Sequence, residues 1–264
     1  MPERIVSLAP SVTEILCALG VGDRLVGVDK WSDHPLYVRS LPKVGRIDAD
    51  LDAVMALRPD LVVACTSVPG MERNIERLAQ SGLVRAVAEP TDLQSTLGSI
   101  RTIGEAVGRA GEADALVKRM EARISLVAAG ARRDDPTSVY WEWWPKPLSA
   151  AAGRSWMSGL IEIAGGRNIF ADTDTASVRP ADDEVIARDP DTIFICWCGA
   201  KRPPEIEQIR ARPGWGRVRA IVDARVYAMP EELFARPGPR LVDGLERLAA
   251  VLSGLTPSHP PAGS

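Results

Sequence analysis

Residues 52–62, DAVMALRPDLV, and residues 183–193, DEVIARDPDTI, follow the same pattern, and the second stretch begins 131 positions after the first. In each copy the apolar spacing predicts a short helix, a proline ends it, and an apolar run predicts a strand buried on both faces. Chance similarity is the alternative, because helix–proline–strand units are common. Six identities in fourteen aligned positions favour duplication: Asp52, Val54, Ala56, Pro59, Asp60 and Cys65 recur as Asp183, Val185, Ala187, Pro190, Asp191 and Cys196.

An offset of half the chain length predicts two similar lobes rather than a solenoid of short repeats. Each lobe is expected to open with a strand, over residues 4–8 and 138–143. After the first strand, Ser11 and Glu14 have the spacing of a helix capping box. After the second, residues 155–164 have a helical pattern closed by two glycines. Strands that alternate with helices indicate parallel sheets covered on both faces.

A helical linker is expected between the lobes. Residues 93–107 form one helical stretch and residues 112–129 a second, with glycines between them. The second stretch is about 18 residues, or roughly 27 Å of helix, and no flexible Gly/Ser-rich hinge accompanies it. Its apolar stripe consists of Leu116, Met120, Ile124 and Val127.

The expected fold is therefore α/β: two similar lobes with mostly parallel sheets, bridged by a long rigid helix, with a ligand cleft between the lobes. In residues, the chain divides into an N-terminal α/β lobe (1–91), a helical linker (92–131), a C-terminal α/β lobe (132–255) and a flexible tail (256–264).

Composition excludes several functions. The 264 residues are 45% hydrophobic and 25% charged, enough to bury a sizeable core. With a net charge of −3 the sequence lacks the excess of basic residues that nucleic-acid binding needs, and no apolar run is long enough for membrane insertion. Only His34 and His259 are histidines, and Cys196 and Cys198 are too closely spaced for the usual zinc pair, so no metal site is expected. Residues 1–8 lack the pattern of an export signal, which leaves a mature secreted chain or a cytosolic protein open.

Tryptophans gather where a ligand would bind. In parallel sheets, ligands bind beyond the carboxyl ends of the strands. Five of the seven tryptophans follow or end predicted strands, where flat rings can stack on a flat apolar ligand: Trp31, Trp141, Trp143, Trp144 and Trp197. Trp141 has the alternative of a core position, because it shares one strand face with Trp143. No nucleophile elbow, P-loop or dinucleotide fingerprint points to a reaction, so we expect no enzyme activity.

Four stretches resemble a known family, the cobalamin-type periplasmic substrate-binding proteins of ABC importers, over residues 4 to about 253. The resemblance implies a two-lobed α/β fold bridged by one long helix, a monomer, and a periplasmic or cell-surface location. It implies a corrinoid as ligand, no catalytic cofactor, and an ABC permease dimer as partner. The stretches are IVSLAPSVTE (5–14), GV followed by SDHP (27–28 and 32–35), LRPDLV (57–62) and GGRNIF (165–170).

The resemblance also assigns roles to residues. Stacking aromatics correspond to Trp31 and to Trp143 or Trp144, and permease-docking acids correspond to Asp52 and Asp183, which the repeat already pairs. Asp is shorter than the family's Glu, and each acid also favours a helix start by itself. Tryptophans of known cobalamin binders align with Arg46, Cys65 and Ser177, and Trp143, Trp144 and Trp197 compensate for them. The complete expected ligand-binding set is Trp31, Arg46, Trp143, Trp144, Trp197, Glu232, Phe234 and Arg236, with His34 as an axial or lip residue.

Two alternatives stay open at this point. Within the same class, the ligand is haem, a siderophore or another metal chelate. In another class, the chain is a cytosolic corrinoid-handling protein or enzyme.

Overall fold

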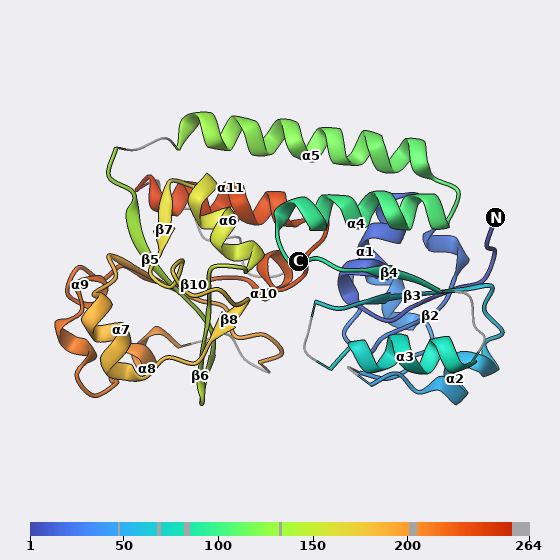
Figure 1. The fold of residues 1–264 in the computed structure, drawn as a ribbon, viewed down its shortest axis with the longest axis horizontal. Helices are drawn as coiled ribbons and strands as arrows, with labels where there is room; N and C mark the ends of the chain where they lie inside the picture. The colour runs from blue at the N-terminus through green and yellow to red at the C-terminus, as the bar shows by residue number, and fades with distance from the viewer. Residues whose placement is uncertain (47, 68–69, 82–84, 132–133, 201–204, 255–264) are drawn as a thin grey trace. The chain divides into compact units, whose positions relative to one another are not determined.

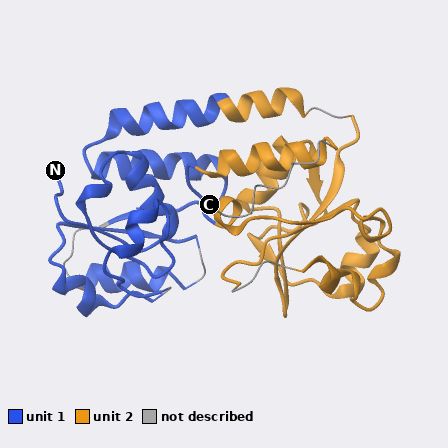
Figure 2. Ribbon diagram, turned by 180° about the vertical axis from the view of Figure 1, so that it is seen from behind, with its two compact units in different colours: residues 1–122, 236–239 blue, residues 123–235, 240–264 orange. Residues whose placement is uncertain are grey.

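The computed structural model describes residues 1–46, 48–67, 70–81, 85–131, 134–200 and 205–254 (Figure 1). The chain forms two compact units, coloured separately in Figure 2. Unit 1 comprises residues 1–122 and 236–239, and unit 2 comprises residues 123–235 and 240–264. The expected tail, residues 256–264, lies outside the described residues.

Unit 1 is built on a four-stranded parallel sheet with the order β2-β1-β3-β4. Figure 1 shows α1 and α4 on one face of this sheet and α2 and α3 on the other. The strands are β1 (Ile5–Ser7), β2 (Leu25–Val28), β3 (Leu61–Cys65) and β4 (Arg85–Ala88). The helices are α1 (Pro10–Ala18), α2 (Leu51–Ala56), α3 (Glu72–Ser81) and α4 (Leu93–Ala106), with 3-10 turns η1 (Gly22–Arg24) and η2 (Leu36–Ser40).

Unit 2 contains a six-stranded sheet with the order β10-β9-β5-β6-β8, in which β7 pairs with β5. Strands β10, β9, β5 and β7 pair in parallel, whereas β6 runs antiparallel to both of its neighbours, β5 and β8. The strands are β5 (Thr137–Pro145), β6 (Leu148–Ala151), β7 (Gly166–Asn168), β8 (Ser177–Val178), β9 (Thr192–Ile195) and β10 (Val226–Ala228). The helices are α6 (Trp156–Ile163), α7 (Asp182–Arg188), α8 (Ile206–Arg210), α9 (Arg219–Val222), α10 (Glu231–Phe234) and α11 (Leu241–Leu252), with a 3-10 turn η3 (Trp215–Arg217).

The long helix α5 (Ala110–Gly130) begins in unit 1 and ends in unit 2. It buries Ala113, Val117 and Met120. Of the expected stripe only Met120 is fully buried, since Leu116, Ile124 and Val127 are half-buried. Within the described residues, no helix combines the length and apolar character needed to cross a membrane.

The internal repeat is visible in the backbone. Its helices are α2 and α7, its strands are β3 and β9, and each of these strands lies between two parallel neighbours. The turns before the strands contain Arg58 and Asp189, both with positive φ (46° and 41°), a conformation rare for residues other than glycine. The next shared acids accept backbone N–H groups at the start of the neighbouring strand: Asp60 from Glu3 and Arg4, just before β1, and Asp191 from Ser138 in β5. The two copies therefore share backbone conformation as well as sequence.

The predicted capping box of α1 is wrong. Ala9 is the N-cap residue, and no side chain caps the helix because alanine has no side-chain acceptor; Pro10 occupies the first helical position, so the helix begins before Ser11, the expected cap. Proline has no N–H to leave unsatisfied at the first helical position, and its fixed φ suits that position. Ser11 and Glu14 are instead buried, and Glu14 forms an ion pair with Arg236.

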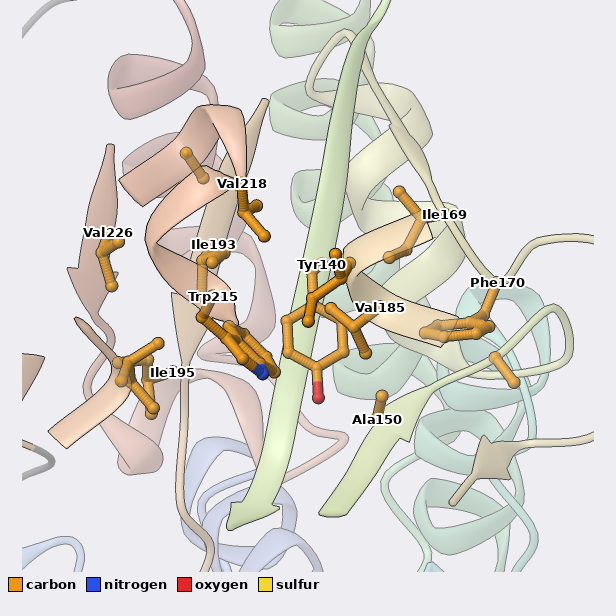
Figure 3. Close-up of a cluster of buried hydrophobic side chains, with 14 residues drawn as sticks. Tyr140, Ala150, Ile169, Phe170, Val185, Ile193, Ile195, Trp215, Val218 and Val226 are labelled. Carbon is orange, nitrogen blue, oxygen red and sulfur yellow. The ribbon is translucent and has the colours of Figure 1, made fainter. Parts of the chain in front are cut away.

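Each unit has a core of its own. In unit 1 the core joins the sheet to α2 and α3 through Val6, Val54, Val62 and Leu78. Figure 3 shows the corresponding cluster of unit 2, in which Tyr140 projects from β5. Its ring lies 6.2 Å from that of Phe170 and 5.8 Å from that of Trp215, both in edge-on geometry.

Candidate functional site

In unit 1 the loop after β2 presents Trp31. The side chain is 38% exposed, while the loop beneath it is anchored. The buried Asp29 carboxylate accepts the Trp31 backbone N–H at 2.8 Å and the hydroxyl of Ser32. Burial raises the pKa of Asp29 above its ordinary value, although these hydrogen bonds oppose the rise. Ser32 Oγ also lies 2.7 Å from Thr13 Oγ1 on α1, so the loop is tied to the core.

Arg236 fastens the same loop from a distant part of the sequence. Its Nη1 donates to Asp33 Oδ1 at 2.6 Å and to Glu14 Oε1 at 3.1 Å. Its Nη2 lies 3.5 Å from the Trp31 carbonyl oxygen. Burial alone would lower the pKa of the Arg236 guanidinium, but the two carboxylates outweigh burial and raise it. Arg236, expected to bind ligand, is therefore engaged in ion pairs within unit 1.

His34 and Arg46 belong to the same unit and both side chains are exposed. His34 follows the anchored Asp33, and Arg46 lies before α2. Within the ranges that the structure describes, no three His, Cys, Asp or Glu side chains gather closely enough to hold a metal ion.

In unit 2 the aromatic strand β5 divides its rings between core and surface. Trp141 is fully buried and packs on Phe194 and Phe234, which is the core position left open from the sequence. Trp143 is half-buried, with its ring 5.6 Å from that of Trp141. Trp144 is 39% exposed, and its Nε1 donates to the Lys146 carbonyl oxygen at 3.1 Å, which sets the orientation of the ring.

A buried acid within this strand was not identified from the sequence. Glu142 is fully buried and receives two hydrogen bonds from Arg212, at 2.6 and 2.8 Å. It also accepts from Trp197 Nε1 at 2.9 Å and from the Tyr140 hydroxyl at 3.1 Å. The sequence does indicate such an acid: a glutamate inside the aromatic run YWEWW (140–144) must be paired if the strand is buried.

Trp197 lines a hollow within unit 2. The hollow has a volume of about 780 Å³, within the range of small-molecule pockets. Its walls come from the β5–β6 turn, the start of α7 and the segment around α8. The lining is Pro145, Lys146, Pro147, Leu148, Pro180, Ala181, Asp182, Trp197, Gln208, Ala211, Arg212 and Pro213.

Two other residues expected to bind the ligand lie on helix α10, one exposed and one buried. Glu232 is exposed, as a ligand-binding acid requires. Phe234 is fully buried, with its ring 4.9 Å from that of Trp141, and its carbonyl oxygen accepts from Trp156 Nε1. Phe234 therefore stabilises the interior of unit 2 and offers no surface to a ligand in this conformation.

The expected docking acids occupy equivalent positions in the two copies. Asp52 lies in the first turn of α2 and Asp183 in the first turn of α7, and both are exposed. Two cysteines that follow β9, Cys196 and Cys198, are free thiols. The neighbouring Cys198 and burial raise the pKa of the Cys196 thiol, which keeps it protonated and unreactive at neutral pH.

Known proteins resemble this chain along most of its length. An uncharacterized ABC transporter substrate-binding lipoprotein, YvrC of Bacillus subtilis strain 168, is 34% identical over 254 residues, 94% of this chain and 79% of that protein. The vitamin B12-binding protein of Photorhabdus laumondii is 26% identical over 253 residues, 96% of this chain and 88% of that protein. The solved structure of the periplasmic heme-binding protein RhuT from Roseiflexus sp. RS-1, in apo form, has a TM-score of 0.84 at 25% identity, covering 97% of this chain and 99% of that one.

The periplasmic binding protein family matches residues 5–233. The match includes the strands of both sheets, among them β5 with Trp144, and the loops that carry Trp31 and Trp197. Because it spans well over half of the sequence, the chain belongs to the periplasmic binding protein family.

Proposed function

We propose that this protein is the substrate-binding component of an ABC importer, and that its ligand is a corrinoid such as cobalamin. Family membership and the similarity to a substrate-binding lipoprotein of an ABC transporter support the first part. The similarity to vitamin B12-binding proteins supports the second. By the same resemblance, the protein acts as a monomer in the periplasm or at the cell surface.

The observation that carries the proposal is a pair of exposed indole rings, one on an anchored backbone and one held by its own hydrogen bond. Trp31 in unit 1 and Trp144 in unit 2 each keep more than a third of their surface exposed. Hydrogen bonds to Asp29 and to the Lys146 carbonyl hold the Trp31 backbone and the Trp144 ring. Exposed flat rings whose backbone or ring is already held stack on a flat conjugated ligand with less loss of conformational entropy than rings on a free loop.

The remaining contacts of the proposed ligand come from half-buried rings and polar groups. Trp143 and Trp197 would add stacking surface, and Arg46 and Glu232 would bind peripheral amides. The exposed His34 would lie at the lip of the site, whereas Phe234 is buried and would not contact the ligand.

Titration of the purified protein with cyanocobalamin, followed by tryptophan fluorescence and calorimetry, tests the proposal. We expect 1:1 binding with strong quenching. Trp31→Ala and Trp144→Ala should each weaken binding about tenfold, since one stacking contact contributes on the order of 1.4 kcal/mol. Leu126→Ala is the control, because Leu126 is 74% exposed on α5, a helix that carries none of the residues proposed to contact the ligand.

Two outcomes would contradict the proposal. Absence of binding at tens of micromolar would exclude cyanocobalamin as the ligand. Conversion of the corrinoid, in place of its unchanged recovery after release, would identify an enzyme instead of a carrier.

Haem is the second candidate ligand, since the heme-binding protein RhuT has nearly the same fold. The same titration with hemin, and with ferric siderophores, separates these chelates from corrinoids. A competition experiment in which hemin displaces the corrinoid would place both ligands in one site.

We also propose that Asp52 and Asp183 dock the loaded protein on a permease dimer. Their equivalent positions in the sequence repeat support this role, because two matching acids suit a two-fold partner. Asp52→Arg with Asp183→Arg should abolish stimulation of the permease ATPase without changing ligand affinity. Equal loss in Glu105→Arg, an exposed acid on α4, would argue against docking through these two acids.

A further inference from the structure

A short segment of the C-terminal half belongs to unit 1. Residues Arg236–Pro239 are assigned to unit 1, although the residues on both sides of them belong to unit 2. Pro237 and Gly238 are buried. A Cβ atom on Gly238 would lie 3.5 Å from the Ser11 carbonyl oxygen, so the segment packs closely on the first turn of α1. This packing brings Arg236 to the loop that presents Trp31.

The Arg236 side chain is mostly buried, and its guanidinium already has partners within the protein. Its side chain is 11% exposed and that of Glu14 is 4% exposed. Both Nη1 hydrogens are used, one on Glu14 and one on Asp33. A buried carboxylate such as Glu14 needs a paired cation, because an isolated charge in the interior is costly. The guanidinium is therefore committed to the protein.

Arg236 contacts Trp31 itself and a residue that closely follows it in the sequence. Asp33 lies two residues after Trp31, and the Trp31 carbonyl oxygen faces Nη2 at 3.5 Å. On the other side of the loop, Asp29 accepts the Trp31 N–H at 2.8 Å. The backbone of Trp31 is thus held through its N–H by one acid and through its carbonyl by one arginine. The indole ring itself remains exposed.

We propose that Arg236 is a positioning residue, which orients Trp31 for stacking on the ligand through the Glu14–Arg236–Asp33 ion pairs and does not itself contact the ligand. This inference rests on the proposed function, because it gives Trp31 a ligand to stack on. It replaces the direct ligand contact that the family resemblance assigns to Arg236. The affinity of unit 1 for a flat ligand then depends on a side chain 205 positions away from the ring.

The first test needs no ligand. Protein labelled with 5-fluorotryptophan has one ¹⁹F resonance per indole, and Trp31→Phe identifies that of Trp31. Arg236→Gln should shift and broaden the Trp31 resonance and increase its quenching by acrylamide, because the loop is released. Arg236→Lys should restore the resonance in part, since Lys keeps the charge but not the planar fork of donors.

Arg39→Gln is the matched control. Arg39 also contacts Asp33: its Nε donates to the Asp33 carbonyl oxygen at 3.2 Å, and its Nη2 lies 4.0 Å from Asp33 Oδ2, but its side chain is 61% exposed. The same change of charge beside the same residue should leave the Trp31 resonance in place. If Arg236→Gln fails to fold, because Glu14 loses the cation beside it, Asp33→Asn removes the Arg236–Asp33 ion pair along with the longer Arg39–Asp33 contact and keeps Arg236 beside Glu14. This variant should move the resonance less but in the same direction, and Arg39→Gln measures the part that Arg39 contributes. An unmoved resonance in folded Arg236 and Asp33 variants would overturn the proposal.

The second test is a double-mutant cycle on the dissociation constant of cyanocobalamin. Arg236→Gln should weaken binding about tenfold when Trp31 is present and less than twofold in the Trp31→Ala background, since residues that act through one another are not additive. Equal losses in both backgrounds would identify a direct ligand contact and overturn the proposal. If no corrinoid binds at all, the proposed function fails, and the ligand-free resonance still decides the role of Arg236.

Discussion

At the scale of a single residue, the buried carboxylate of Glu142 holds several side chains of unit 2 together through hydrogen bonds. It has no exposed surface, yet four hydrogen bonds from three side chains satisfy it. One of these donors is Trp197 Nε1, so the acid also sets the orientation of a ring proposed to bind the ligand. Burial raises the pKa of the Tyr140 hydroxyl well above its ordinary value, which keeps it protonated as a donor to Glu142.

Arg212→Met should destabilise the protein by about 3–5 kcal/mol, because it leaves the Glu142 carboxylate buried without a cation. Adding Glu142→Gln to that variant should recover most of the loss, since the amide oxygen still accepts a hydrogen bond without carrying charge. Urea denaturation at pH 7 measures both. The control is Arg210→Met, whose partner Glu207 is 77% exposed, and it should cost less than about 1 kcal/mol. Similar losses for Arg210→Met and Arg212→Met would contradict this account.

At the scale of elements, the repeated turn before β3 and β9 joins each strand to the first strand of its unit. In unit 2 the Asp191 carboxylate accepts the Ser138 N–H at 2.9 Å and the Ser138 hydroxyl at 2.6 Å. Burial alone would raise the pKa of Asp191, but the bonds from Ser138 and the charges of Arg219 and Arg225 outweigh it and lower the pKa. The ionised carboxylate therefore stabilises the junction of β5 and β9.

This lowered pKa predicts a pH dependence. A carboxyl group whose pKa is lower in the folded state stabilises the protein above its unfolded pKa, about 3.9, and the stabilisation is lost as the pH falls through the folded pKa. Asp191→Asn should cost about 1–2 kcal/mol at pH 7, from weakened charge-assisted hydrogen bonds. The difference from the parent protein should shrink as the pH falls below about 5. Urea denaturation across this range measures it, and a difference that stays constant with pH would refute the role of the ionised carboxylate.

Most elements could be predicted from the sequence, because helices and buried strands leave local patterns. The helices over residues 93–107 and 155–164 and the repeated strands appear within one or two residues of the expected positions. The antiparallel β6 was missed because β5 continues to Pro145, beyond the expected end at residue 143, and turns back at Lys146 and Pro147. That hairpin depends on pairing between strands, which the alternation within one strand does not encode.

At the scale of the whole molecule, the chain is two units with separate cores. Val62 lies at the centre of the unit 1 core on β3, and Val185 lies in the unit 2 core on α7. Both side chains are fully buried. Sheet strands in a compact unit with its own core open together in hydrogen exchange, as one cooperative block.

Val62→Ala and Val185→Ala form a matched pair, and each should cost about 1–3 kcal/mol in its own unit. Hydrogen exchange under native conditions, read by mass spectrometry, should show faster exchange in β1–β4 for Val62→Ala. For Val185→Ala the faster exchange should be confined to β5–β10. Acceleration of both sheets by either variant would instead mean that the chain opens as a single cooperative block.

The sequence by itself determined the class of fold, the duplication and most of the helices and parallel strands, since these follow from the spacing of neighbouring residues. The tertiary structure alone decided which residues meet. It paired Arg236 with Glu14 across 222 positions, bound Trp197 to Glu142 and buried Phe234 against Trp141. Local patterns carry backbone conformation and burial, whereas the pairing of charges and rings depends on which elements fold together, and that is a property of the packed chain.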